Sequence, residues 1–305
     1  MPAWIPLLSL LAAYAPQALA SCAYGTHLHR RADVIEAPKF GYSAANGPAN
    51  WFNLDPEANA LCATGDHQSP INMAEGSFTL IPASDLKIEI PNFTKGAEFE
   101  NLGSTVEVVT EDLGANLTID KTTYNLKQFH FHLPSEHLDD GTSMAMEMHM
   151  VWASEDKDLA VIGIFIDLDD GASASSHKRK AAGRRSLGSL KTDPATPSTV
   201  VTTVLNSVDK IATLGKTTHT KPLKMSEIVS LLKSGSFQSY SGSLTTPPCS
   251  EGVKWLVSTK KVSIPTSTYL KARSVIGYNA RFPQNVPGEE NIMSLYANKA
   301  DEHDD

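Results

Sequence analysis

From Phe78 to Phe165 the chain is a succession of apolar and alternating segments separated by turn residues. The clearest are STVEVVT, ANLTIDKTTYNLKQFHFHL, AMEMHMVWAS and LAVIGIFIDL, and GVKWLVSTKKVSI repeats the pattern near the C-terminus. Segments of this length and alternation, bounded by turn residues, are typical of strands. The pattern therefore predicts a β-dominated α+β fold with a large sheet.

Two later segments follow a helical period instead. The first, VVTTVLNSVDKIATLG, ends at Gly215 and places five apolar residues on one face: Val201, Val204, Leu205, Val208 and Ile211. The second, SEIVSLLKSG, begins at a capping residue, Ser226, and ends at Gly235. The pattern therefore predicts two helices in this part of the chain.

The 305-residue chain shows no internal repeat, so a single domain over residues 32–298 is the simpler interpretation. Residues 32–65 are rich in Gly, Asn, Pro and Trp, which suits an irregular segment packed on the core. Residues 169–199 are polar, small and basic without an apolar face, which predicts a disordered surface insertion. An acidic tail, residues 299–305, ends the chain.

The N-terminus predicts secretion. Residues 1–20 hold an apolar run that ends in an A-x-A cleavage site, which is typical of a signal peptide and too short to span a membrane. No later run is long and apolar enough to cross a bilayer. Two sequons, at Asn92 and Asn116, are potential glycosylation sites. We expect a secreted protein of the extracellular or cell-wall space.

Arg30-Arg31 has two interpretations, a dibasic processing site that removes residues 21–31 as a pro-segment, or an exposed basic pair in a disordered N-terminus. The chain has three cysteines, and removal of this segment would take Cys22 with it and leave Cys62 and Cys249 as one pair. The net charge of −8 argues against a nucleic-acid partner. The pattern gives no indication of an oligomeric state.

The stretch QFHFHLPSEH concentrates three histidines and a glutamate in residues 128–137. In a strand His130 and His132 share one face, and in AMEMHMVW Glu147, His149 and Val151 share the face opposite the methionines. Asp140-Gly141 is a strong hairpin dipeptide, and a two-residue loop there would place His132 opposite His149 and His130 opposite Val151. Pro134 makes the pairing next to the turn irregular.

A lone histidine on a strand is usually a surface or hydrogen-bonded core residue. Three imidazoles on one face of two adjacent strands favour a metal site over that interpretation. Three neutral imidazoles suit zinc and leave a fourth position open for water. His130, His132 and His149 are thus the predicted ligands.

Seven sequence blocks in order resemble the α-class carbonic anhydrases. They are FGYSAANGPANW, DHQSPINM, QFHFH with SEH, MEMHMVW, LAVIGIF, GSLTTPPC and YNARFPQ, and they extend from about residue 39 to 285. The resemblance implies a large, twisted, mostly antiparallel central sheet with short peripheral helices. It also implies zinc-dependent, reversible hydration of CO2 to bicarbonate and a proton, by attack of zinc-bound hydroxide.

The resemblance carries roles for individual residues. Gln128, Glu147 and the main chain of Asn279 would orient the ligand histidines. Thr245 would donate a hydrogen bond to Glu136 and accept one from the zinc hydroxide. The water network would be lined by Tyr42 and Thr246, and the apolar CO2 pocket by Val151, Val161, Leu244 and Trp255. His137 would be a structural polar residue behind the site.

Two further positions follow from the resemblance. Ser104 occupies the position at which fast members carry a proton-shuttling histidine, so proton exit is expected to be impaired. Cys62 and Cys249 stand where many secreted members have a disulfide. Two alternative functions stay open, a catalytically weak member that acts as a binding module and a zinc esterase acting on small activated esters.

Overall fold

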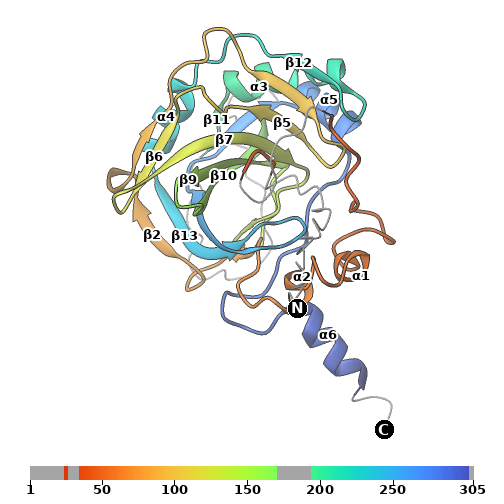
Figure 1. The fold of residues 1–305 in the computed structure, drawn as a ribbon. Helices are drawn as coiled ribbons and strands as arrows, with labels where there is room; N and C mark the ends of the chain where they lie inside the picture. Colours follow the sequence, from red (N-terminus) through yellow and green to blue (C-terminus); the bar gives the residue numbers. More distant parts are fainter. Residues whose placement is uncertain (1–23, 27–33, 170–193, 302–305) are drawn as a thin grey trace, which may run out of the picture.

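A large curved β-sheet forms the body of the protein in a computed structural model that describes residues 24–26, 34–169 and 194–301 (Figure 1). Its main path runs in the order β12-β4-β5-β7-β9-β10-β14-β13-β2. Most neighbours are antiparallel, whereas β10 pairs in parallel with both β14 and β15. The predicted fold class is confirmed, with the qualification that the sheet is mixed.

The strands are β1 (Asn72–Met73), β2 (Thr79–Pro82), β3 (Lys87–Glu89), β4 (Glu98–Asn101), β5 (Val106–Val109), β6 (Asn116–Ile119), β7 (Thr122–His132), β8 (Leu138–Asp139), β9 (Met146–Ser154), β10 (Leu159–Asp169), β11 (Thr196–Pro197), β12 (Thr217–His219), β13 (Ser236–Ser243), β14 (Glu251–Ser258) and β15 (Val262–Pro265). The α-helices are α1 (Trp51–Leu54), α2 (Leu61–Thr64), α3 (Thr199–Leu205), α4 (Ser226–Lys233), α5 (Thr266–Ile276) and α6 (Ile292–Asp301), and the 3₁₀ helices are η2 (Ala83–Asp85) and η3 (Val208–Ile211).

The two faces of the sheet bury different clusters of apolar side chains. Phe129 and Phe131 of β7 and Met148 of β9 belong to the larger cluster, together with the apolar faces of α3 and α4. Val151 and Trp255 belong to a smaller cluster on the other face. Figure 1 shows α3, α4 and α5 outside the curve of the sheet, so the smaller cluster lies on its inner side. The predicted period-two division of β7 and β9 is therefore realised.

The predicted pairing of β7 with β9 is wrong by two residues. His130, not His132, lies opposite His149, and Gln128 lies opposite Val151. The turn at Asp140-Gly141 does form, since both residues have positive φ and Asp139 bridges Thr142. However, residues 133–145 leave the β7–β9 ladder, and β8 pairs in parallel with β1 instead. The turn therefore does not fix the pairing of β7 with β9, because the connection between the turn and β7 is irregular and contains Pro134.

The ends of the predicted insertion that the structure describes, residue 169 and residues 194–199, belong to the folded domain. Asp169 still belongs to β10, and Thr196–Pro197 pair with β15. Ser198 accepts a hydrogen bond from the Val201 N–H and caps α3. Residues 170–193 lie outside the described residues.

Two details of the helices also differ from the predictions. The first helical pattern is divided into α3 and η3, although all five of its predicted apolar residues are buried. Ser226 is the first residue of α4 and not its side-chain cap. Its N–H donates instead to Oδ1 of Asn92, 2.9 Å away, so the cap comes from a residue distant in sequence.

The segment from residue 34 to 65 is irregular apart from α1 and α2, as predicted, and Trp51 is its fully buried anchor. The predicted disulfide is confirmed, because Cys62 of α2 is bonded to Cys249, with a Cα–Cα distance of 5.1 Å. This bond ties the N-terminal segment to the loop between β13 and β14, which carries Thr245 and Thr246.

The C-terminal helix α6 extends away from the body of the molecule (Figure 1). It continues to Asp301, so the first residues of the predicted acidic tail are helical. Within the described ranges, no helix has the length and apolar character needed to cross a membrane.

Candidate metal centre

Strands β7 and β9 bring the three predicted ligand histidines together. His130 and His132 are two residues apart on β7, and His149 is paired with His130 across the ladder. The ring centroids are 4.6–5.4 Å apart, and Nε2 of His130 lies 3.1 Å from Nε2 of His132. One nitrogen from each ring falls within a group whose members are all within 4.8 Å of one another. We call these three residues the metal site.

The second nitrogen of each imidazole is held by a different oxygen. Nδ1 of His130 lies 2.8 Å from Oε1 of Gln128, and Nδ1 of His132 lies 2.8 Å from the carbonyl oxygen of Asn279. Nε2 of His149 lies 2.9 Å from Oε1 of Glu147. Each oxygen accepts a hydrogen bond from the ring N–H, which leaves the opposite nitrogen of that ring with its lone pair.

A buried nitrogen without a hydrogen-bond partner is the clearest sign that this cluster suits a metal. Nδ1 of His149 is buried and has no partner among the described residues. Leaving such an atom unpaired costs about 1–3 kcal/mol unless it binds something else. Three imidazole nitrogens converging in this way are a donor set that zinc prefers, with room for a fourth ligand.

Burial keeps the three imidazoles neutral. It is the largest influence on all of them, and with the neighbouring His149 it lowers the pKa of His132 to about 3. Burial and the two adjacent imidazoles hold the pKa of His130 well below its ordinary value, and burial also lowers the pKa of His149. At neutral pH no proton competes with a metal for these nitrogens.

Glu147 is a buried carboxylate with all its acceptor sites in use. Oε1 accepts from His149 and from Nδ1 of His137, 2.7 Å away. Oε2 accepts the backbone N–H groups of Glu136 and His137, each at 2.9 Å. Burial raises the pKa of this carboxyl, but His137 and His149 outweigh burial and hold the pKa well below its ordinary value. Glu147 is therefore ionised and fixes the His149 ring.

Glu136 lies on the other side of His149. Its Oε1 accepts the N–H of Arg281 at 2.8 Å, and Oε2 lies 3.8 Å from Nδ1 of His149. Burial raises the pKa of Glu136 well above its ordinary value, whereas the Arg281 N–H and a hydrogen bond from Thr245 favour the carboxylate. A cation at the metal site would favour the carboxylate further.

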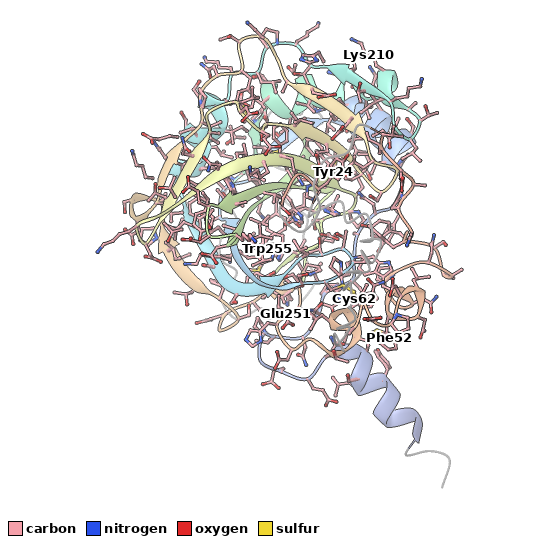
Figure 2. All side chains as sticks on the ribbon, viewed as in Figure 1. Tyr24, Phe52, Cys62, Lys210, Glu251 and Trp255 are labelled. Atoms are coloured by element: carbon pink, nitrogen blue, oxygen red, sulfur yellow. A yellow bond between two sulfur atoms is a disulfide. The ribbon has the colours of Figure 1, made fainter. Side chains whose placement is uncertain are left out.

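The four predicted pocket residues lie together beside the histidines. Val161 of β10 is paired with Val151 on one side and with Trp255 on the other. The Trp255 ring centroid is 4.8 Å from that of His149, and Leu244 belongs to the same apolar cluster. Figure 2 places Trp255 on the inner side of the curved sheet. These side chains form an apolar wall next to the metal site.

The remaining predicted residues make other contacts than this wall. Thr246 follows Thr245 and is fully buried, and Tyr42 makes edge contacts with Phe40, Trp51 and Tyr278. Ser104 is 7% exposed, and its carbonyl oxygen accepts from Nδ2 of Asn279 at 3.0 Å. Ser104 is thus hydrogen-bonded to Asn279, the residue whose carbonyl oxygen holds the His132 ring.

Two supporting residues, Arg281 and Tyr240, had no specific sequence signal. The backbone N–H of Arg281 reaches Glu136, while the Arg281 guanidinium binds Gln68 and the carbonyl oxygens of Ser69 and Cys62. His137 lies 2.7 Å from the Tyr240 hydroxyl, which in turn donates to Ser69. His137 was predicted to be a structural residue. Its partners Glu147 and Tyr240 lie on β9 and β13, and no local sequence pattern connects these strands with His137.

The sequence model of the eukaryotic-type carbonic anhydrase family matches residues 46–292. A carbonic anhydrase of Neisseria gonorrhoeae is 32% identical over 258 residues, which cover 84% of each chain.

Two solved structures share the fold. The fungal α-carbonic anhydrase of Aspergillus oryzae is 33% identical, with a TM-score of 0.74, over 85% of this chain and 99% of the other. The α-carbonic anhydrase of Thermovibrio ammonificans, solved in complex with the inhibitor sulfanilamide, is 28% identical, with a TM-score of 0.64, over 83% and 97% of the two chains.

Proposed function

Because the chain belongs to the eukaryotic-type, or α-class, carbonic anhydrase family of enzymes, we propose that it catalyses the reversible hydration of CO2 to bicarbonate and a proton with zinc at the metal site. One observation carries the assignment of zinc to these residues. Three neutral, buried imidazoles present converging nitrogens, and Nδ1 of His149 has no hydrogen-bond partner among the described residues.

His130 and His132 would hold zinc through Nε2, and His149 through Nδ1, because their other nitrogens are already bound. Carbonic anhydrase is the standard case in which zinc lowers the pKa of a coordinated water to about 7 and so supplies a nucleophile at neutral pH. Gln128, Glu147 and the Asn279 carbonyl orient the rings and increase their basicity.

Glu136 and Thr245 control the direction of one hydrogen bond. A hydroxyl can donate only one hydrogen bond, and Thr245 donates it to the Glu136 carboxylate. The Thr245 oxygen can then only accept a hydrogen bond. It therefore favours a reacting group that donates a hydrogen bond, and it orients the lone pair of that group. The N–H of Arg281 holds Glu136 in place for this role.

The apolar wall supplies the binding surface for CO2. Its side chains offer no hydrogen bond to the substrate, and they belong to Val151, Val161, Leu244 and Trp255. The one polar atom among them, Nε1 of Trp255, already donates to the Ser243 carbonyl oxygen, 2.9 Å away. A nonpolar molecule is therefore favoured there over water. Bicarbonate, which is charged, is disfavoured against the same wall, and this assists its release.

The direct test is stopped-flow CO2 hydration by the zinc-loaded chain from residue 21, both intact and after cleavage at Arg30-Arg31. We expect activity that His149→Ala abolishes together with zinc binding. His219→Ala, which changes an exposed histidine on β12, is the matched control and should retain both. Full zinc occupancy in His149→Ala would refute the ligand assignment. Zinc binding without CO2 hydration in either form would favour the binding-module alternative.

We also propose that the chain is secreted and glycosylated. The Cys62–Cys249 disulfide supports an oxidising compartment. Asn92 is exposed and Asn116 is partly exposed on β6, so both sequons are accessible in the folded chain. N-terminal sequencing of the protein recovered from the culture medium, with and without glycosidase, tests this proposal. An intact Met1 would contradict it.

A further inference from the structure

A groove separates helix α4 from the paired strands β3 and β6. Its volume is about 480 Å³, within the range of about 300–1,000 Å³ that small-molecule sites occupy. Its lining includes Glu89 of β3, Asn116 of β6, and Val229 and Lys233 of α4. Figure 1 shows α4 and β6 next to each other on the outer side of the sheet. We call this groove the α4 groove, and it lies on the opposite side of the sheet from the apolar wall.

The acceptor residue of one sequon lines the α4 groove. Asn116 is paired with Glu89 across the two strands, and its Nδ2 donates to the carbonyl oxygen of Gly114, 3.3 Å away. A primary amide nitrogen carries two hydrogens, so this bond leaves the second one for attachment of a sugar. Gly114 also lines the groove, and a methyl group added there would meet no atom within 4 Å among the described residues outside its chain neighbours. Space is therefore open beside the group that holds Asn116.

The side chains of the α4 groove suit a saccharide. Val229 and Pro91 provide apolar surface, and Val229 also packs against the core. Lys233 and Glu89 are exposed and charged, so they can donate and accept hydrogen bonds. Glu89 uses Oε2 in an ion pair with Lys87 at 2.9 Å, which fixes the carboxylate at the rim. N-acetylglucosamine combines apolar C–H groups and a methyl group with hydroxyls and an amide, and a mostly apolar groove with a few polar groups is complementary to it.

From these observations we propose that the α4 groove binds the first N-acetylglucosamine of a glycan on Asn116. This inference rests on the proposed glycosylation. In the attachment, Nδ2 of Asn116 forms a bond to C1 of the sugar and loses one proton. The bond between C1 and a lipid-linked diphosphate breaks, and the diphosphate leaves. The co-reactant is thus a lipid-linked oligosaccharide, and the remaining N–H of Asn116 still donates to Gly114.

The other sequon provides a comparison within the same molecule. Asn92 stands outside the lining of the α4 groove, although its Oδ1 accepts the N–H of Ser226, which lines the groove. A glycan on Asn92 is therefore near α4 without being attached inside the groove. If proximity alone were sufficient, loss of either glycan would have the same effect on the lining residues.

The experiment uses the secreted protein and two variants that each lose one sequon. Thr118→Val removes the hydroxyl that the Asn116 sequon requires and keeps a β-branched side chain in β6. Thr94→Val does the same for Asn92. Thr118→Ser keeps the sequon and is the conservative replacement. Mass spectrometry of peptides establishes which asparagine carries a glycan in each protein.

The readout is the rate at which acetic anhydride acetylates the Lys233 amine. A sugar attached beside its site has an effective concentration in the millimolar range, so it should cover Lys233 most of the time and slow acetylation by about tenfold. We therefore expect Thr118→Val to accelerate acetylation of Lys233 by that factor, and Thr118→Ser and Thr94→Val to leave it unchanged. Lys210, an exposed lysine on η3 (Figure 2), should react at one rate in all four proteins.

Equal acetylation of Lys233 with and without the Asn116 glycan would overturn the binding of the sugar in the groove and keep the proposed glycosylation. The same acceleration in Thr94→Val would also overturn it, because proximity would then explain the shielding. Absence of a glycan from Asn116 would overturn it directly, and absence from both sequons would reject the proposed glycosylation as well. CO2 hydration should be equal in all four proteins, since the groove and the metal site lie on opposite sides of the sheet.

Discussion

The two faces of strand β7 are equally buried and yet are held in opposite ways. Phe129 and Phe131 face helices α3 and α4 and are stabilised by removal of apolar surface from water. His130 and His132 on the other face are just as inaccessible, but their polar atoms are matched one by one to oxygens. Burial on one face is the source of stability. On the other face burial is a cost that specific hydrogen bonds offset, and in return it lowers the pKa of the imidazoles.

The prediction with the largest expected effect compares Glu147→Ala with Met148→Ala, which change adjacent residues on opposite faces of β9. Glu147→Ala leaves four donors without an acceptor and should cost about 3–5 kcal/mol of unfolding free energy, together with a 10–100-fold loss of zinc affinity. Met148→Ala should cost about 2–5 kcal/mol through the cavity alone. Urea unfolding and zinc titration measure both quantities, and a comparable loss of zinc affinity in Met148→Ala would contradict the division of roles.

The pH dependence of the metal-free protein should come from the histidine face. His132 has an unfolded pKa of about 6.5 and a folded pKa of about 3, so the unfolded state binds the proton first. The stability contributed by the neutral ring is present above about pH 6.5 and is lost as the pH falls toward 3, by up to about 1.4 kcal/mol per pH unit. His130 and His149 shift in the same direction.

Urea midpoints between pH 4 and 8 check this prediction. The substitution Met148→Leu, on the opposite face, should lower the whole curve without changing its slope. Zinc should raise the stability without changing this slope, because the imidazoles of the folded state are already neutral before the metal binds. A flat profile without metal would show that the imidazoles are not buried as neutral rings.

The smallest expected effect concerns the proton that leaves the site. Ser104 does not titrate near neutral pH, so kcat should rise with the concentration of an imidazole-type buffer, while kcat/KM stays nearly constant. Ser104→His should raise kcat about tenfold in dilute buffer and remove the buffer dependence. Ser104→Ala is the matched control and should leave both unchanged. Fast turnover of the natural sequence in dilute buffer would assign proton transfer to another group.

The sequence by itself determined the parts of this protein that are local. Period two on β7 and β9 predicted which face holds His130, His132 and His149, because alternation along a strand is a property of the backbone. The same argument placed Val151 on the wall. The family resemblance added the disulfide and the partners of the histidines, including the carbonyl of Asn279.

Only the tertiary structure decided the β7–β9 register, the Arg281 N–H on Glu136 and the Asn92 cap of α4. Register depends on how residues 133–145 leave the ladder to meet β1, which no turn dipeptide encodes. Backbone donors carry no side-chain signature, since every residue except proline has the same N–H. Contacts of this kind follow from the packing of the whole chain and not from any local pattern.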